Sequence, residues 1–103
     1  MDSLHFDALA VVKMASGHLC LNLSERVTWE NFPEFAQHLL DSLKGRVVQK
    51  NDAPDMRLWK IDVGGHSLRL VFDDYPMMVA LESSDTDGDT LIENLHWKLS
   101  QAR

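Results

Sequence analysis

The chain has 103 residues, of which 45% are hydrophobic and 25% are charged, which is the composition of one globular domain spanning residues 1–103. Its formal net charge of -6 argues against nucleic-acid binding, because an acidic surface repels phosphate backbones. No apolar run approaches the ~18 residues of a membrane span, and the N-terminal residues lack a secretory signal, so we expect a cytoplasmic protein without a membrane partner.

A β-hairpin is the first predicted structure. Residues 8–14 are apolar and rich in β-branched side chains, and leucines alternate with other residues over 19–23, as in a strand with one buried face. The glycine-containing stretch at residues 15–18 is typical of a turn. We therefore expect two antiparallel strands here.

An amphipathic helix is predicted from an apolar stripe between residues 32 and 43, where apolar side chains recur three and four positions apart. Two starts are open. Thr28 can be the N-cap, or Asn31 can be the N-cap with Glu34 as its capping-box partner. We expect Gly45 to end the helix, because glycine commonly follows the last helical turn.

Four strands are predicted after this helix. Gly64 and Gly65 are typical of a two-residue hairpin turn, because glycine adopts positive φ without a steric penalty. The stretch NDAPD at residues 51–55 predicts a loop. The predicted strands are residues 46–50, 56–63, 66–72 and 77–82.

A second helix is predicted from about residue 87 to residue 101. Leu91, Leu95, Leu99 and Ala102 fall on one face of this helix, with Ile92 at its edge. Trp97 lies on the opposite side, where it can anchor an interface or fold back over a neighbouring turn.

These elements predict an α+β fold in the order β-β-α-β-β-β-β-α. The simplest way to bury the apolar faces is a mostly antiparallel sheet with two helices packed on one face. The other face of the sheet would then be partly solvated or covered by a partner. A homodimer formed through an exposed sheet edge is also open.

The acidic residues concentrate in one segment. Seven of the 16 acids, and no lysine or arginine, lie between Arg69 and Lys98. Such a field favours a basic protein partner or a metal ion. We expect this segment to be a docking surface. The residues predicted to bind a partner are Asp73, Asp74, Tyr75, Glu82, Asp85, Asp87, Asp89, Glu93 and Trp97.

The motif DTDGD is similar to the opening of a helix–loop–helix calcium site. Asp85, Asp87 and Asp89 match the first, third and fifth positions, which supply oxygen ligands. The match then fails, because Thr90 stands where glycine makes the sharp turn and His96 stands where glutamate binds the ion. We interpret the motif as an acidic turn in which Asp87 or Asp89 caps the last helix, and we expect no cofactor. The alternative is a Ca²⁺- or Mg²⁺-dependent regulator or enzyme that uses this loop.

No sequence motif for catalysis is present. The five histidines show no zinc-binding spacing, and the single cysteine, Cys20, is predicted to be a small core or sheet-face residue. Asp73 and Asp74 precede Pro76, a context typical of turn formers, although adjacent carboxylates can also hold Mg²⁺. We therefore predict that the protein is not an enzyme and has no catalytic residues.

The segment RLWKIDVGGHSLRLVFDDYPMMVALES, at residues 57–83, resembles the centre of a small-protein family of unknown function from gammaproteobacteria. The resemblance rests on Trp59, on FDDYP at residues 72–76 and on LES at residues 81–83. It implies a bacterial cytoplasmic domain without assigned chemistry, and it brings no catalytic residues.

Composition, charge and the absence of catalytic motifs together predict a small, acidic, non-catalytic binding or accessory protein. An immunity-type inhibitor of a basic toxin and a chaperone-like protein for a secreted partner both fit this description. Charge would steer the encounter with a basic partner, and apolar residues such as Trp97 would supply most of the affinity.

Overall fold

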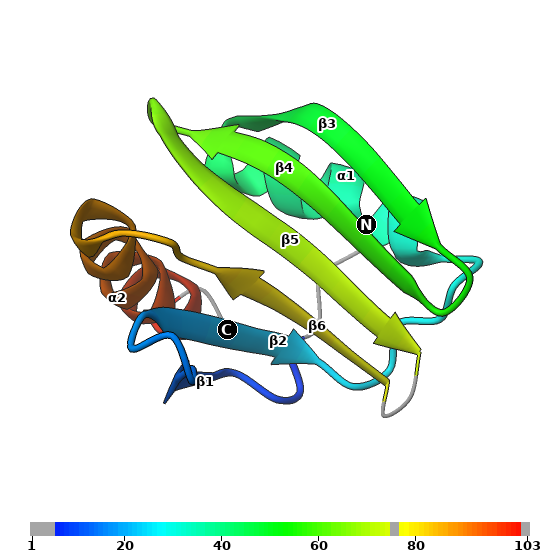
Figure 1. The fold of residues 1–103 in the computed structure, drawn as a ribbon, viewed down its shortest axis with the longest axis horizontal. Coiled ribbons are helices and arrows are strands. Elements are labelled where there is room, and N and C mark those ends of the chain that lie inside the picture. Colours follow the sequence, from blue (N-terminus) through cyan, green and yellow to red (C-terminus); the bar gives the residue numbers. More distant parts are fainter. Residues whose placement is uncertain (1–5, 75–76, 102–103) are drawn as a thin grey trace.

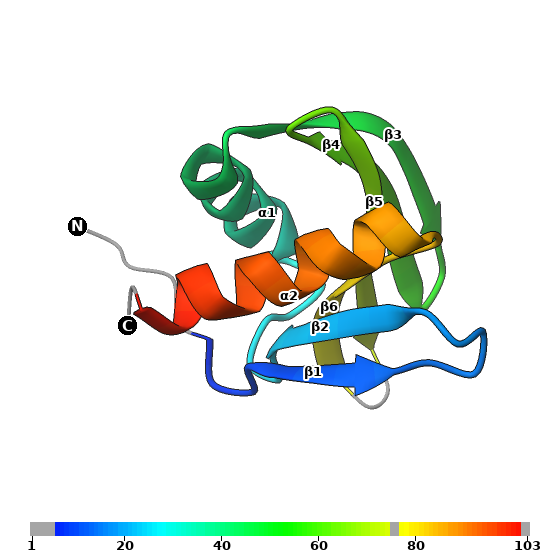
Figure 2. The same cartoon turned by 90° about the vertical axis from the view of Figure 1, so that its left-hand side faces the viewer.

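The computed structural model describes residues 6–74 and 77–101. It contains one six-stranded antiparallel sheet and two helices that pack on the same face of that sheet (Figures 1 and 2). This is the predicted α+β fold, with the predicted order of elements. The elements are β1 (Ala10–Lys13), β2 (Leu19–Ser24), α1 (Phe32–Leu43), β3 (Gly45–Ala53), β4 (Met56–Val63), β5 (His66–Asp74), β6 (Met77–Glu82) and α2 (Thr86–Gln101).

The strands lie in the order β1-β2-β6-β5-β4-β3, so four of the five pairings join strands that are neighbours in the chain. The exception is the pairing of β2 with β6, in which Leu21 lies opposite Leu81. This pairing joins the first hairpin to the β3–β6 meander and closes one continuous sheet.

The turn between β4 and β5 forms as predicted. Gly64 has a φ of 62° and Gly65 a φ of 86°, which places both in the region that side chains other than glycine rarely adopt. Their strands pair in register from Met56 opposite Asp73 to Val63 opposite His66. The bounds predicted for β4 and β6 are confirmed, and β5 extends two residues beyond its predicted end.

The loop predicted at residues 51–55 is wrong, because these residues mostly continue β3. Asp52 pairs with Arg57 across the β3–β4 hairpin and Ala53 pairs with Met56. The Asp52 carboxylate accepts hydrogen bonds from Trp59 Nε1 at 2.9 Å and from Arg57 Nη1 at 2.8 Å. These bonds to β4 compensate for the low strand propensity of the stretch.

The start of α1 differs from both capping schemes. Asn31 is the N-cap residue, but its side chain makes no capping hydrogen bond to the helix. It accepts instead from the Thr28 backbone N–H at 2.8 Å, while the Asn31 N–H donates to Thr28 Oγ1 at 3.2 Å. This reciprocal pair stabilises the turn that leads into the helix, and Glu34 faces His38 one turn later rather than capping.

The end of α1 corrects the role predicted for Gly45. Lys44, with φ 58° and ψ 40°, is the left-handed residue after the helix, and Gly45 is already the first residue of β3. A Cβ on Gly45 would lie 2.9 Å from the Asp62 carbonyl oxygen and 3.0 Å from Val63 Cγ2. Glycine is therefore needed there for close approach to β4, not for positive φ.

The core lies between the sheet and the two helices. One row of side chains crosses four neighbouring strands on this covered face, in the order Leu21, Leu81, Leu70 and Trp59, and each is at most 3% exposed. Phe32 of α1 packs edge-on against Trp59, with ring centroids 4.8 Å apart. Trp59 therefore belongs to the core beneath α1 and not to an outer apolar patch.

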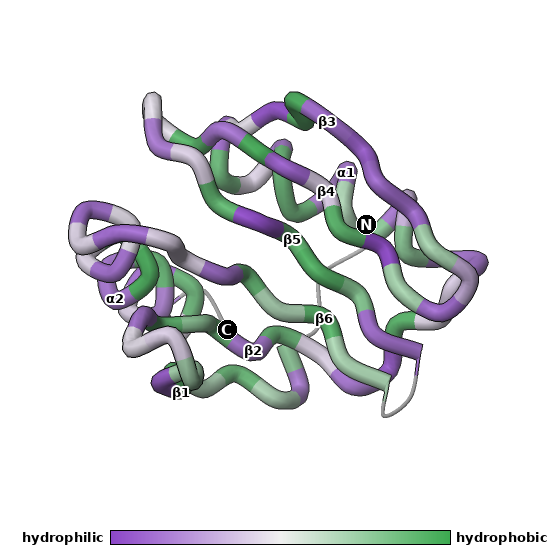
Figure 3. The backbone as a smooth tube through the Cα atoms, in the orientation of Figure 1, coloured by the Kyte–Doolittle hydropathy of each residue, from purple (hydrophilic) through white to green (hydrophobic). Residues whose placement is uncertain are grey.

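Figure 1 looks onto the opposite face of the sheet, and within residues 6–74 and 77–101 no helix packs on that face. Side chains alternate along β5, with Leu68, Leu70 and Phe72 on the covered face and Arg69 and Val71 on the other. Figure 3 shows that β3, at the sheet edge, is mainly hydrophilic, in contrast to β6. The β3 margin of the sheet is therefore more polar than its middle.

Two substitutions at the end of α1 distinguish the two reasons for a glycine there, close approach of β4 and positive φ. Gly45→Ala should lower the free energy of unfolding by about 1–3 kcal/mol, because its Cβ meets the β4 backbone. Lys44→Gly should leave stability unchanged or raise it by up to about 1 kcal/mol, because it relieves a left-handed non-glycine residue. Urea unfolding of both variants measures the two effects, and the reverse ranking would contradict this role for Gly45.

Candidate functional site

The fold divides the acidic segment among three places. Asp73 and Asp74 lie at the end of β5 that meets the start of β6. Glu82 lies near the opposite end of the same strand pair, facing Arg69 on the uncovered face. Asp85 precedes α2, and Asp87, Asp89 and Glu93 lie on this helix, on the covered side of the sheet (Figure 1). The segment is thus not one continuous acidic surface. Tyr75 lies outside the described residues.

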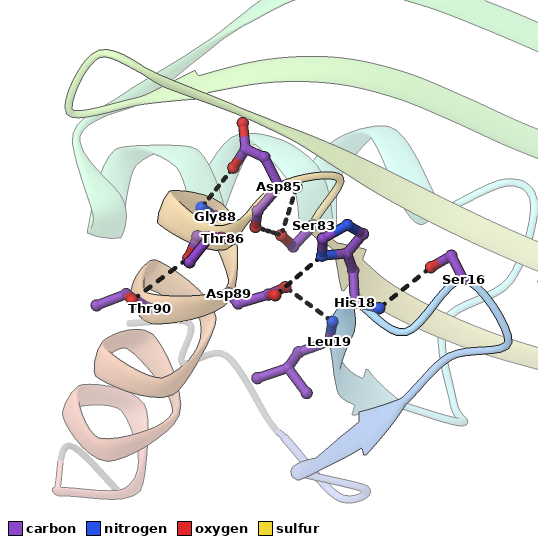
Figure 4. Close-up of polar contacts among 9 residues, drawn as sticks. All are labelled: Ser16, His18, Leu19, Ser83, Asp85, Thr86, Gly88, Asp89 and Thr90. Atoms are coloured by element: carbon purple, nitrogen blue, oxygen red, sulfur yellow. Dashed lines mark hydrogen bonds and ion pairs between the residues drawn. The ribbon is translucent and has the colours of Figure 1, made fainter.

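Asp85, not Asp87 or Asp89, caps α2 (Figure 4). Its carboxylate accepts a 2.6 Å hydrogen bond from the Gly88 N–H, three residues into the helix, as an N-cap side chain does. The buried Ser83 hydroxyl donates to the Asp85 carbonyl oxygen at 2.9 Å and fixes this residue from behind. A Cβ on Gly88 would overlap Ser83 Oγ, so glycine lets the first turn pack tightly on the end of β6.

The side chain of Asp89 projects from α2 and binds the start of β2. Its Oδ1 accepts the Leu19 backbone N–H at 2.9 Å, and its Oδ2 accepts from His18 Nδ1, also at 2.9 Å. The Leu19 carbonyl in turn accepts the Ser83 N–H at 3.0 Å. The backbone N–H and C=O of Leu19, the first residue of β2, are therefore both bonded to residues at or just before the start of α2. These bonds connect the N-terminus of the helix to the sheet.

The hydrogen bond from the His18 ring, followed by that from the Leu19 N–H, lowers the pKa of the Asp89 carboxyl below its ordinary value. The carboxylate is therefore ionised and can only accept, so His18 Nδ1 is the donor in this contact. Sequence reasoning missed this pair, because its members are 71 residues apart and belong to no spacing motif.

A histidine–carboxylate pair can act as a general base, but here its surroundings favour a structural role. The nearby hydroxyl of Ser83 is buried and already donates to the Asp85 carbonyl oxygen, so it is not a free nucleophile. The Ser16 hydroxyl accepts the His18 backbone N–H at 3.3 Å and shapes the turn before β2. The contacts of this cluster connect β2 to α2.

The calcium-loop alternative requires residues that this fold does not bring together. Residues 86–101 form a helix, so Asp87 and Asp89 project from a helix surface rather than into a loop. Asp85 is bonded to Gly88, and Asp89 is bonded to His18 and Leu19. Among residues 6–74 and 77–101, no group of three or more His, Cys, Asp or Glu side chains is arranged to hold a metal ion.

The outward side of α2 carries the remaining predicted residues. The buried residues of this helix are Gly88, Ile92, Leu95 and Leu99, so Ile92 belongs to the buried face itself rather than to its edge. Ala102 lies outside the described residues. Trp97 is 67% exposed and does not fold back over a neighbouring turn. Glu93 lies one helical turn before it, and Asp87 is exposed in the first turn. We call Asp87, Glu93 and Trp97 the α2 outer surface.

Cys20 lies on the uncovered face beside Glu82 of β6. It is 8% exposed, which confirms a sheet-face residue. Burial raises the pKa of its thiol, and the Glu82 carboxylate adds to this effect. The thiol is therefore protonated at neutral pH and is a poor nucleophile.

Comparison with known proteins gives a family without an activity. A protein-family model described as "Protein of unknown function (DUF3630)" matches residues 9–101. Because this match covers most of the chain, the protein belongs to that family. No curated protein and no solved structure matches the chain. In the part of the chain that the structure describes, no helix is long and apolar enough to cross a bilayer.

The Asp89 connection should be visible in the pH dependence of stability. Because folding lowers the pKa of Asp89, its contribution is present at neutral pH and is lost as pH falls below the ordinary value of 3.8 and through the folded pKa. Asp89→Asn should lower Tm by several degrees at pH 7, and the difference from the original protein should shrink in acid. Thermal melts between about pH 7 and pH 2.5 measure both effects.

Asp87→Asn is the matched control, because it removes the same charge two residues earlier from a side chain without a hydrogen bond or ion pair among the described residues. Its Tm should follow that of the original protein at every pH. Equal behaviour of the two variants would show that the contacts with His18 and Leu19 do not stabilise the fold.

Calcium should leave this protein unchanged. A ligand that binds the native state raises Tm by mass action, and weak sites of the calcium-loop class respond at about 1 mM. Because residues 86–101 are helical, we expect equal Tm values in chelator and in about 1 mM calcium. A rise of several degrees that Asp87→Asn abolishes would restore the calcium-loop interpretation.

Proposed function

We propose that the protein is a non-catalytic binding module whose α2 outer surface docks a basic protein partner. The observation that carries this proposal is Trp97, a tryptophan that is 67% exposed on a helix whose other side already packs on the core. Folding does not require an exposed indole at this position. Large aromatic side chains supply much of the affinity at protein interfaces, so contact with a partner gives Trp97 a role.

Charge supports a basic partner. Asp87 and Glu93 lie on the same helix as Trp97 and are both exposed. The only basic residue of α2 is Lys98, in its last turn, where it complements the helix dipole. Acidic side chains around an aromatic anchor speed the encounter with a positively charged surface, and the anchor then slows dissociation.

The fold narrows the predicted docking surface. The carboxylate of Asp85 caps α2 and that of Asp89 binds β2, so both are already hydrogen-bonded within the chain. They would add negative charge near a partner but little direct contact with it. Asp73 and Asp74 lie at the far end of β5, and Glu82 faces Arg69 on the other side of the sheet. Of the nine residues predicted from the sequence, the proposal therefore retains Asp87, Glu93 and Trp97 for direct contact.

The kind of binding protein, its origin and its location are also part of the proposal. An immunity-type inhibitor that covers a basic toxin and a chaperone for a secreted protein both use an acidic contact surface without catalysis. A gammaproteobacterial origin and a cytoplasmic location fit either role and stay predictions. The metal-dependent alternative is disfavoured by the helical conformation of residues 86–101.

Quantitative capture from a lysate of the source organism tests the α2 outer surface. Immobilised Trp97→Ala should retain a specific partner about tenfold less well than the original protein, which corresponds to about 1.4 kcal/mol. Glu93→Gln should also reduce capture, and the reduction should be larger at low salt than at high salt. The reason is that salt screens the attraction between an exposed carboxylate and a basic partner. Mass spectrometry of the retained proteins measures both effects.

Two controls make the result specific. Val48→Ala truncates another exposed apolar side chain, 57% exposed on β3, and should retain the partner fully. Glu34→Gln removes an exposed acid from α1 and should also have no effect. Capture that survives Trp97→Ala, or that falls equally in the controls, would refute the proposed surface.

A further inference from the structure

The uncovered face of the sheet is apolar at its centre, although none of the elements that the structure describes packs on it. Val71, Ala80 and Cys20 lie on three neighbouring strands of this face and are only 6–8% exposed, because longer neighbours crowd around them. Leu58 and Met78 flank this centre and are half-buried. The outward-facing apolar set is Val12, Cys20, Leu58, Val71, Met78 and Ala80.

A shallow hollow interrupts the same face at its β3–β4 end. Asn51, Ala53, Met56 and Leu58 line it together with Asp52, and its volume is about 280 Å³. Its lining is mostly apolar. A hollow of this size can accommodate side chains from an opposing protein surface.

The charges on this face sum to zero, unlike those of the rest of the chain. Three basic and three acidic side chains face outward here, so the whole excess of -6 lies elsewhere. Arg46 contacts Asp62 at 3.5 Å, and Arg69 contacts Glu82 at 3.2 Å. The outward-facing charged set is Arg46, Lys60, Asp62, Arg69, Asp73 and Glu82.

We propose that a second copy of this chain packs on the uncovered face, sheet against sheet, about a two-fold axis that runs along the strands between β5 and β6. Arg69 and Glu82 are direct partners on these two central strands. An axis between them places Arg69 of one copy opposite Glu82 of the other, and the reverse pair forms by symmetry. The face is thus complementary in charge to itself.

The size of the face is sufficient for such a contact. Six strands spaced about 4.8 Å apart, with central strands of six to nine residues at about 3.3 Å each, cover roughly 500–700 Å² in projection. Side-chain relief increases the area that becomes buried, so the face approaches the ~800 Å² per partner of standard interfaces. Aligned packing of two sheets is also a common arrangement.

Charge and edge structure favour this occupant over two others. A basic partner would be drawn to the acidic remainder of the molecule, because the uncovered face has no net charge. Pairing through the β3 edge is hindered by the irregular register between Val47 and Gln49 and by Lys50 beyond it, features that protect edge strands. The neutral face is where two copies that each carry -6 can meet with least repulsion.

Sedimentation equilibrium of charge-swap variants of the full chain tests the two-fold contact. The original protein should be a dimer at high micromolar concentration. Arg69→Glu alone and Glu82→Arg alone should each weaken dimerisation at least about tenfold, because like charges then face each other across the axis. An equimolar mixture of the two single variants should form a heterodimer, since each position 69 again meets an opposite charge at position 82.

The mixture separates contact between copies from contact within one chain. Each single variant still lacks its internal Arg69–Glu82 pair, so recovery on mixing can come only from pairs between chains. Arg46→Glu is the matched control, because it reverses a charge on the same face but far from the axis, and it should still dimerise. Circular dichroism verifies that every variant is folded.

The proposal would be overturned by an original protein that is monomeric at all concentrations. It would also be overturned by a mixture that stays monomeric while the chain carrying both Arg69→Glu and Glu82→Arg dimerises. A dimer that persists in both single variants would place the contact elsewhere, on the β3 edge for example. Because Trp97 lies on the helix side of the sheet, none of these outcomes depends on the proposed binding of a basic partner.

Discussion

The structure depends on the alternation of side chains along the four inner strands of the sheet. One set, in the row from Leu21 through Leu81 and Leu70 to Trp59, is buried beneath the two helices. A slip of one residue in any of these strands would turn its apolar set toward solvent, so burial fixes the register. Because both helices cover the same face, the other face is left to solvent or to a second protein.

The acids that concentrate in one segment of the sequence have different roles once the chain is folded. Asp85 caps α2, and Asp89 joins this helix to the first residue of β2. Glu82 forms an ion pair with Arg69 across the two central strands of the uncovered face. Asp87 and Glu93 are exposed on α2, and Glu93 lies one helical turn before the exposed Trp97. A run of like charge in a sequence therefore says little about a surface until the turns within it are placed.

Local physics made much of the fold predictable from the sequence. The bounds of β4 and β6, the Gly64–Gly65 turn and the helix over residues 32–43 follow from periodicity and from the freedom of glycine. The outward position of Trp97 follows from helical geometry alone. Each of these features depends on residues that are close together in the chain.

Features that depend on distant residues were not predictable. The β2–β6 pairing and the His18–Asp89 contact join segments about 60 to 70 residues apart, and no local pattern marks either. The NDAPD stretch looked like a loop because its propensities are those of a turn, yet Asp52 is held in β3 by Trp59 and Arg57. Gly45 looked like a helix terminator, but the close approach of β4 explains its identity.

The central functional claim is that Trp97 is a contact residue, and hydroxyl-radical footprinting of the protein inside living cells tests it most directly. The buried Trp59 provides an internal reference in the same chain, since the core shields it in every state. We expect oxidation of Trp97 to be several-fold slower in cells than in the purified protein, with Trp59 unchanged. Equal oxidation of Trp97 in both settings would show that no partner covers it and would contradict the proposed function.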